Sequence, residues 1–216
     1  MKPKIVPLGD SALLVQFGDE IDLTVNQRVH ALAALLDKSP IEGFLEAVPA
    51  YGTLLMHYDP LVLEYAKANL WVKAKLEQIQ DSKSRRSRRI DVPVNYGGEY
   101  GPDLESVAAY HNLQIKDVIR IHSERIYTVY MMGFTPGFPY MGKLDDAIVT
   151  PRLELPRTNI PAGSVAIAGS QTGIYPLASP GGWRLIGHTS LVLFAPQSDM
   201  PFLFAPGDEV KFIPEN

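Results

Sequence analysis

The sequence has no cysteine among its 216 residues. This absence excludes disulfides, thiolate nucleophiles, Cys-ligated zinc sites and iron–sulfur clusters. It also fits a reducing compartment, so we expect a cytoplasmic protein. No stretch reaches the ~18 consecutive apolar residues of a membrane-spanning helix, and the first residues lack the apolar segment of a secretory signal. We therefore expect no association with membranes.

The common catalytic motifs are absent as well. The sequence has no P-loop pattern, no GxGxxG and no HExxH. Residues 169–173 have the glycine spacing of a nucleophile elbow, but Gln171 stands where the serine would be. The sequence therefore predicts neither a serine nucleophile nor a metal site.

The net charge of the chain is small. Lys and Arg number 20 and Asp and Glu number 24, which gives a formal net charge of −4. A general nucleic-acid binder needs a basic face, so we expect no nucleic-acid partner. The hydrophobic fraction of 46% and the charged fraction of 20% are typical of a globular chain.

Glycine and proline divide the chain into two regions. Residues 1–89 hold 4 Gly and 5 Pro, whereas residues 90–216 hold 13 of each. The change falls at residues 81–89, which contain five cations and no apolar side chain. We predict a small domain over 1–80, a basic linker over 81–89 and a second domain over 90–216. The linker is either a solvated hinge or a contact for an acidic partner.

The first region has an α+β pattern, with alternating apolar strands and apolar residues at helical spacing. The second has short β-rich segments between Gly/Pro turns, which favours a closed barrel or a sandwich. The predicted elements of the first region are a strand over 12–17, a helix capped by Asp22, a hairpin of 44–48 with 53–58, and a helix over 61–80 capped by Asp59. Those of the second are strands over 90–94, 126–132, 164–168, 184–195 and 209–213, a helix capped by Asp103 and a helix over 115–122.

A loop over 133–142 (GFTPGFPYMG) holds three aromatic residues between glycines and prolines. A rigid aromatic loop suits ligand contact. We predict that Phe134, Pro136, Phe138 and Tyr140 border a ligand; the alternative is that the aromatic rings plug one end of a barrel.

A second loop, 150–163 (TPRLELPRTNIPAG), carries two arginines stiffened by prolines. Arginine recognises carboxylate and phosphate groups in a planar, two-pronged geometry. We predict that Arg152 and Arg157 are catalytic residues that bind an anion; the alternative is that each pairs with an acidic residue such as Glu154 or Asp145.

A third segment, 169–190, is rich in small residues that leave the backbone N–H groups accessible to an anion. We predict roles here for five residues, the alternative being tight barrel turns with a buried Trp and a hydrogen-bonded His. The predicted ligand-binding residues are Gln171, Thr172, Tyr175 and Trp183, and His188 is the third predicted catalytic residue, with Arg152 and Arg157.

Runs at 133–142, 161–165 (PAGSV), 168–176 (AGSQTGIYP) and 179–183 (SPGGW) closely resemble the 5-oxoprolinase B-subunit family, also called the kinase-A-inhibitor-like or allophanate-hydrolase-subunit-1 family. The resemblance extends over essentially the whole chain, and together these long motifs are highly specific. It implies an α+β N-terminal domain plus a mostly-β C-terminal cyclophilin-like barrel.

The resemblance also implies a function as the B-subunit of an ATP-dependent 5-oxoprolinase. With partner subunits A and C, such a protein helps convert 5-oxoproline to glutamate while ATP, with Mg²⁺, is hydrolysed to ADP and phosphate. Phosphorylation of the amide oxygen makes the stable lactam electrophilic, which requires positioning and donors around the phosphoryl group. Many family members have Arg at the position of His188.

Two other functions are compatible with the resemblance. One is inhibition of a sensor histidine kinase, which requires only a docking surface. The other is half of a biotin-dependent carboxyltransferase, as in urea amidolyase; the chain contains no biotin-attachment sequence of its own.

Overall fold

The computed structural model describes residues 2–79 and 88–215, and the chain forms two compact units, Met1–Arg86 and Ser87–Asn216. Most of the predicted linker over 81–89 lies outside the described residues. Its last two arginines are described and lie in the second unit. Arg88 donates to Asp208 at 2.7 Å, and Arg89 begins a strand of that unit.

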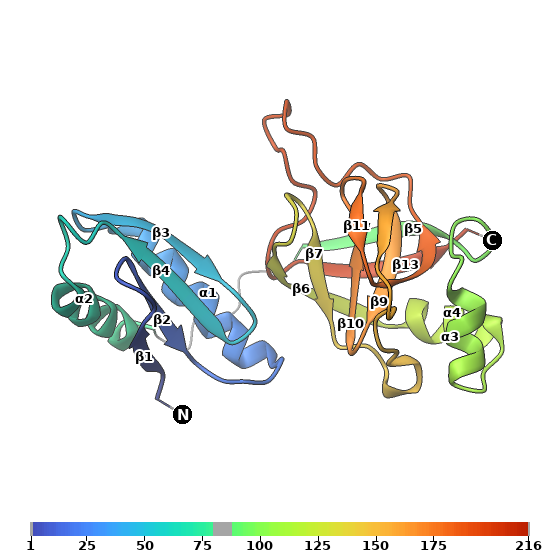
Figure 1. Cartoon of the computed structure of the whole chain (residues 1–216), viewed down its shortest axis with the longest axis horizontal. Coiled ribbons are helices and arrows are strands. Elements are labelled where there is room, and N and C mark those ends of the chain that lie inside the picture. Colours follow the sequence, from blue (N-terminus) through green and yellow to red (C-terminus); the bar gives the residue numbers. More distant parts are fainter. Residues whose placement is uncertain (1, 80–87, 216) are drawn as a thin grey trace. The chain divides into compact units, whose positions relative to one another are not determined.

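The first unit is a four-stranded antiparallel sheet with two helices (Figure 1). The strand order is β1-β2-β4-β3. Its elements are β1 (Lys4–Pro7), β2 (Ala12–Gln16), α1 (Leu23–Lys38), β3 (Phe44–Pro49), β4 (Thr53–Tyr58) and α2 (Tyr65–Glu77). Alternate residues of β4 are buried and pack with the apolar stripe of α1. This is the core that the two periodicities predict.

Capping residues predicted the start of the first helix in this unit correctly and the start of the second incorrectly. The Asp22 carboxylate accepts a hydrogen bond from the backbone N–H of Val25, as predicted for the cap of α1. The predicted start of the second helix is wrong. Asp59 accepts from the N–H of Leu61 in a separate turn, and α2 begins only at Tyr65. A capping residue followed by proline is compatible with both a helix and a turn.

The second unit contains a closed seven-stranded barrel, which confirms the expected barrel (Figure 1). The strand order is β10-β7-β6-β13-β5-β12-β9, and β9 pairs with β10 to close it. All pairs are antiparallel except β13 with β5. The strands are β5 (Arg89–Tyr96), β6 (Ile126–Met132), β7 (Pro139–Gly142), β9 (Ser164–Ala168), β10 (Gln171–Ile174), β12 (Arg184–His188) and β13 (Glu209–Pro214).

Shorter elements surround the barrel. Two strands, β8 (Arg157–Ile160) and β11 (Ser179–Gly181), form a separate small sheet, and η1 (Asp146–Ile148) is a single 3-10 turn. The sequence did not predict β1, β7, β8, β10 or β11. The predicted strand over 184–195 is too long, because β12 ends at His188. The unpredicted strands have only three or four residues, and all except β8 contain glycine or proline, so they show too little alternation to be recognised.

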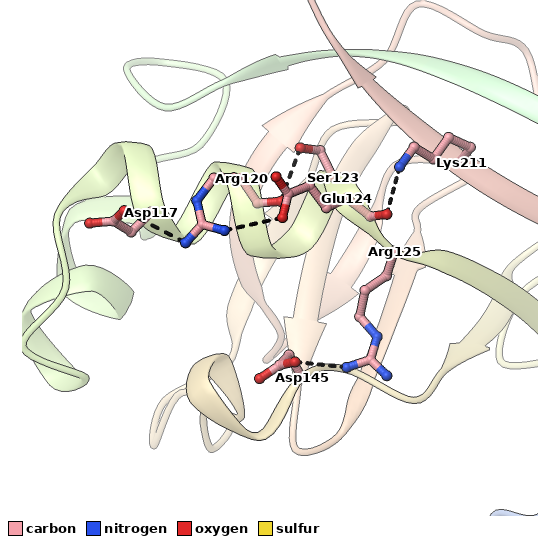
Figure 2. A network of polar contacts seen from close by, with 7 residues as sticks. All are labelled: Asp117, Arg120, Ser123, Glu124, Arg125, Asp145 and Lys211. Atoms are coloured by element: carbon pink, nitrogen blue, oxygen red, sulfur yellow. Dashed lines mark hydrogen bonds and ion pairs between the residues drawn. The ribbon is translucent and has the colours of Figure 1, made fainter.

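Helices α3 (Leu104–Tyr110) and α4 (Ile115–Glu124) lie together at one end of this unit (Figure 1). Polar contacts fix the end of α4 to the barrel (Figure 2). Lys211 of β13 donates to the backbone carbonyl of Glu124 at 2.7 Å, which satisfies a carbonyl at the helix terminus. Arg125, which follows the helix, pairs with Asp145 at 2.9 Å. These groups are largely exposed, so we interpret the network as structural.

Candidate functional site

A polar pocket in the second unit brings together two of the three residues predicted to be catalytic, Arg157 and His188. Its volume is about 370 Å³. Strand β12 pairs with both β5 and β9, so the loop after β5 meets the ends of these strands. The lining residues are Glu99, Tyr100, Pro102, Arg157, Asn159, Pro161, Ser164, Leu185 and His188.

Asp103 holds the guanidinium of Arg157 in place. Nη2 of Arg157 donates to Oδ1 of Asp103 at 2.8 Å, and Oδ2 of Asp103 accepts from the backbone N–H of Leu185 at 2.7 Å. The Asp103 side chain is 9% exposed and that of Arg157 is 30% exposed. Nη1 of Arg157 is buried and has no hydrogen-bond partner among the described residues. The guanidinium is therefore fixed while part of its donor capacity remains unused.

This arrangement corrects the predicted role of Asp103. The residue precedes α3 as expected, but its side chain makes no capping hydrogen bond. Its carboxylate is taken up by Arg157 and by the backbone of β12 instead. An ion pair that is mostly shielded from water outweighs a cap at a short helix.

His188 lies at the end of β12 with its ring against the aromatic ring of Tyr100. The two ring centroids are 5.7 Å apart. Nε2 lies 2.9 Å from the carbonyl oxygen of Ala162, so Nε2 carries the proton and donates it. In the neutral ring Nδ1 is then an acceptor. Gly163 permits this approach, because its φ is +83° and a Cβ there would lie 2.7 Å from Nε2.

Arg152, the third predicted catalytic residue, does not line this pocket. It is exposed and lies near the hydroxyls of Tyr140 and Tyr175. Burial raises the pKa of Tyr140, and the positive charge of Arg152 partly opposes that rise. Arg152 thus lies outside the pocket lining, although both arginines are close enough to Tyr175 for their charges to oppose the rise in the pKa of its hydroxyl.

Most of the predicted aromatic ligand residues form a packed cluster. Phe138, Tyr175 and Trp183 are at most 5% exposed, and the ring centroids of Phe138 lie 5.2 Å from Tyr175 and 5.4 Å from Trp183. Partly buried Tyr140 packs against them. Ala166 and Ala168 contribute to this cluster, whereas the alternate residues of β9 face the barrel core. The cluster therefore lies on the outer face of the barrel wall.

Tyr175 is anchored within this cluster. Burial raises the pKa of its hydroxyl, and a hydrogen bond from the backbone N–H of Trp183 opposes the rise. None of Phe138, Tyr175 and Trp183 lines the polar pocket. Their contacts support the loops around it, which makes them packing residues.

Phe134 and Pro136 instead line an apolar groove of about 660 Å³. One side of the groove is formed by residues 132–137 and the other by residues 199–206, which belong to the long excursion between β12 and β13 (Figure 1). Phe134 is 59% exposed and has a φ of +64°. This groove contains neither Arg157 nor His188, so the predicted site residues that line a pocket are divided between two pockets.

Gln171 and Thr172 line neither pocket. Gln171 is half-buried in β10. Thr172 faces the barrel interior, where its Oγ1 lies 2.9 Å from Nε2 of His122 and donates to the carbonyl of Ala166. Burial lowers the pKa of His122 to about 3, so its ring is neutral and connects β10 to α4 inside the core.

The sequence analysis missed four residues around the polar pocket: Glu99, Tyr100, Asp103 and Asn159. Glu99 and Tyr100 lie in the glycine-rich turn 97–101, and this composition was the one available signal. Among residues 2–79 and 88–215 no group of three His, Asp or Glu side chains is placed to hold a metal ion. No helix in this part of the chain is long and apolar enough to cross a bilayer.

Comparison with known proteins gives relatives over nearly the whole chain. The family model for the carboxyltransferase domain, subdomains C and D, matches residues 3–204. The chain is 44% identical to the 5-oxoprolinase B-subunit of Bacillus subtilis, covering 97% of this chain and 92% of that protein. It is 42% identical to the 5-oxoprolinase B-subunit of Escherichia coli O157:H7, covering 96% and 94%.

A solved structure of the protein TTHA0988 has the same fold, with a TM-score of 0.84 and 38% identity. The match covers 95% of this chain but only 40% of that one. In that relative, the part that resembles this chain is therefore joined to a longer stretch of polypeptide.

Proposed function

Because the chain belongs to the 5-oxoprolinase B-subunit family, we propose that it is one component of an enzyme that hydrolyses 5-oxoproline to glutamate with ATP. One observation carries this proposal: identity of 42–44% extends over more than nine-tenths of both this chain and its curated relatives. The alignment thus includes both units and every residue of the polar pocket.

The proposal assigns the nucleotide to a partner subunit. The described residues hold no cluster of carboxylates suited to Mg²⁺, and the sequence has no P-loop. The polar pocket contributes a single arginine to bind anions. This donor set does not fit a magnesium–triphosphate group. ATP would therefore bind to a partner subunit and not to this chain.

The residues of this chain are suited to holding a substrate in position. Asp103 and the backbone of β12 fix Arg157, and Ala162 fixes His188. A preorganised cation with spare donors orients an anionic reactant without having to reorganise during the reaction. The chemical steps themselves then require groups from the partner subunits A and C.

The test is reconstitution. The full chain is purified alone and then combined with subunits A and C encoded in the same genome, and glutamate release from 5-oxoproline is measured with ATP and Mg²⁺. We expect turnover only when the partners are present, and none when ATP is replaced by a non-hydrolysable analogue. Turnover by the isolated chain, or no turnover by the full set, would contradict the proposal.

A further inference from the structure

The polar pocket combines a cation, a carboxylate and an amide with apolar walls. Arg157, Glu99 and Asn159 supply the polar groups, and Tyr100 and Leu185 belong to the apolar part of the lining. We propose that this pocket binds the substrate itself, a small cyclic amide bearing a carboxylate, with Arg157 at the carboxylate. This inference rests on the proposed function and assigns its substrate site to this chain.

The state of Arg157 favours a carboxylate ligand. A guanidinium has five N–H donors, and Asp103 is the one side chain bonded to it within the described residues. A carboxylate matches the two-pronged donor geometry of arginine, and the Arg157 side chain, which is 30% exposed, retains N–H groups that Asp103 does not use.

The other lining groups fit the rest of a lactam. Its ring N–H is a donor suited to the Glu99 carboxylate, and its carbonyl is an acceptor suited to the Asn159 amide. The flat ring suits the apolar walls. The volume of about 370 Å³ is in the range of small-molecule sites.

The pocket should also discriminate against the product. Ring opening adds water and converts the neutral amide into a second carboxylate and an ammonium group, so glutamate keeps the net charge of 5-oxoproline but carries two more ionised groups. The pocket offers one cation for two carboxylates, and moving two additional charged groups out of water is unfavourable. We therefore expect 5-oxoproline to bind more tightly than glutamate, which aids product release.

Binding to the full chain is measured by calorimetry with four probes: 5-oxo-L-proline, 2-pyrrolidinone, which lacks the carboxylate, L-glutamate and inorganic phosphate. We expect 5-oxoproline to bind at least tenfold more tightly than the other three. In Arg157→Lys we expect its affinity to fall at least tenfold, with 2-pyrrolidinone unaffected. The matched control is Arg120→Lys, in an exposed network on α4 (Figure 2), which should leave the affinity unchanged.

The same variants are assayed in the reconstituted complex. Arg157→Lys should raise the KM for 5-oxoproline at least tenfold and leave the KM for ATP unchanged. Since Arg157→Lys also disturbs the ion pair with Asp103, its thermal unfolding is recorded, and Asn159→Ala at an exposed position provides a second variant with the same expectation.

The outcomes distinguish a failure of the proposed substrate pocket from a failure of the proposed function. If the wild-type complex is active and both variants have an unchanged KM for 5-oxoproline, the pocket is not the substrate site, and the proposed function still holds. If the wild-type complex is inactive, the proposed function fails. The calorimetric binding of 5-oxoproline to the full chain then tests the pocket by itself. Phosphate binding more tightly than 5-oxoproline, equal binding of 2-pyrrolidinone, or no binding with an unchanged KM would each overturn this inference.

Discussion

Asp103 and Arg157 are 54 residues apart in the sequence, yet Oδ1 of the aspartate lies 2.8 Å from Nη2 of the arginine. This ion pair connects the start of α3 to β8, and the second carboxylate oxygen connects both to β12. Three segments that the sequence analysis treated separately therefore meet at one carboxylate. Arg157 and Leu185, which this carboxylate joins, both line the polar pocket.

Asp103→Asn should destabilise the protein by roughly 1–3 kcal/mol in urea unfolding, because it removes the charge opposite a largely buried guanidinium. The value lies below that of a fully buried pair because Arg157 is 30% exposed. The matched control is Asp91→Asn, which removes an exposed pair with Arg89 and should cost less than about 0.5 kcal/mol. Equal losses in the two variants would show that the junction is unimportant for stability.

The buried His122 should make stability depend on pH. Burial lowers its folded-state pKa to about 3, whereas an unfolded His titrates near 6.5. Between these values the unfolded chain binds more protons, so the free energy of unfolding falls as pH drops below about 6.5. His122→Gln should flatten the slope by up to ~1.4 kcal/mol per pH unit. Urea unfolding at several pH values between 4.5 and 7.5 measures both slopes, and identical slopes would refute the assignment.

Phe134 and Phe138 are four residues apart and should respond differently to truncation. Phe138→Ala empties a buried position between Tyr175 and Trp183 and should cost ~3–5 kcal/mol. Phe134→Ala removes a side chain that is 59% exposed and should cost less than about 1 kcal/mol. Thermal or urea unfolding of both variants tests this difference; similar losses would mean that the aromatic cluster is not a packing unit.

Gly163→Ala should be more damaging than Gly207→Ala, although both glycines have nearly the same φ, +83° and +87°. The strain of a left-handed alanine, about 1–2 kcal/mol, is common to both. Only at Gly163 would the new Cβ meet neighbours: the backbone carbonyl oxygen of Thr189, which is the nearest, and Nε2 of His188 at 2.7 Å. We expect at least ~1 kcal/mol more destabilisation at Gly163 in urea unfolding. Equal effects would show that the contacts with Thr189 and His188 relax without cost.

Strong local patterns predicted the fold well. The Asp22 cap, the hairpin of β3 and β4 and the apolar stripe of α1 lie where the spacing placed them, because each depends on neighbours within a few residues. The Gly/Pro-rich half was predicted to be β-rich, and it forms the barrel. The strands that escaped prediction are short and are stabilised by pairing with distant segments.

The site was predicted only in part. Arg157 and His188 were chosen for their residue types, and the structure brings them into one pocket. Phe138, Tyr175 and Trp183 came from the same kind of glycine-rich run, and the structure uses them for packing. An aromatic side chain suits both a binding loop and a core, so residue type cannot distinguish these uses.

The sequence by itself determined which family this chain resembles, that its two halves differ in composition, and which segments carry helices and long strands. Those properties follow from residue identity and short-range spacing. The tertiary structure alone decided that β12 lies between β5 and β9 and that Asp103 pairs with Arg157 instead of capping a helix. It also decided that Arg152 lies outside the pocket. The physical reason is that these contacts join residues tens of positions apart, whose partners are selected by closure of the barrel and by burial, and no local spacing records that choice.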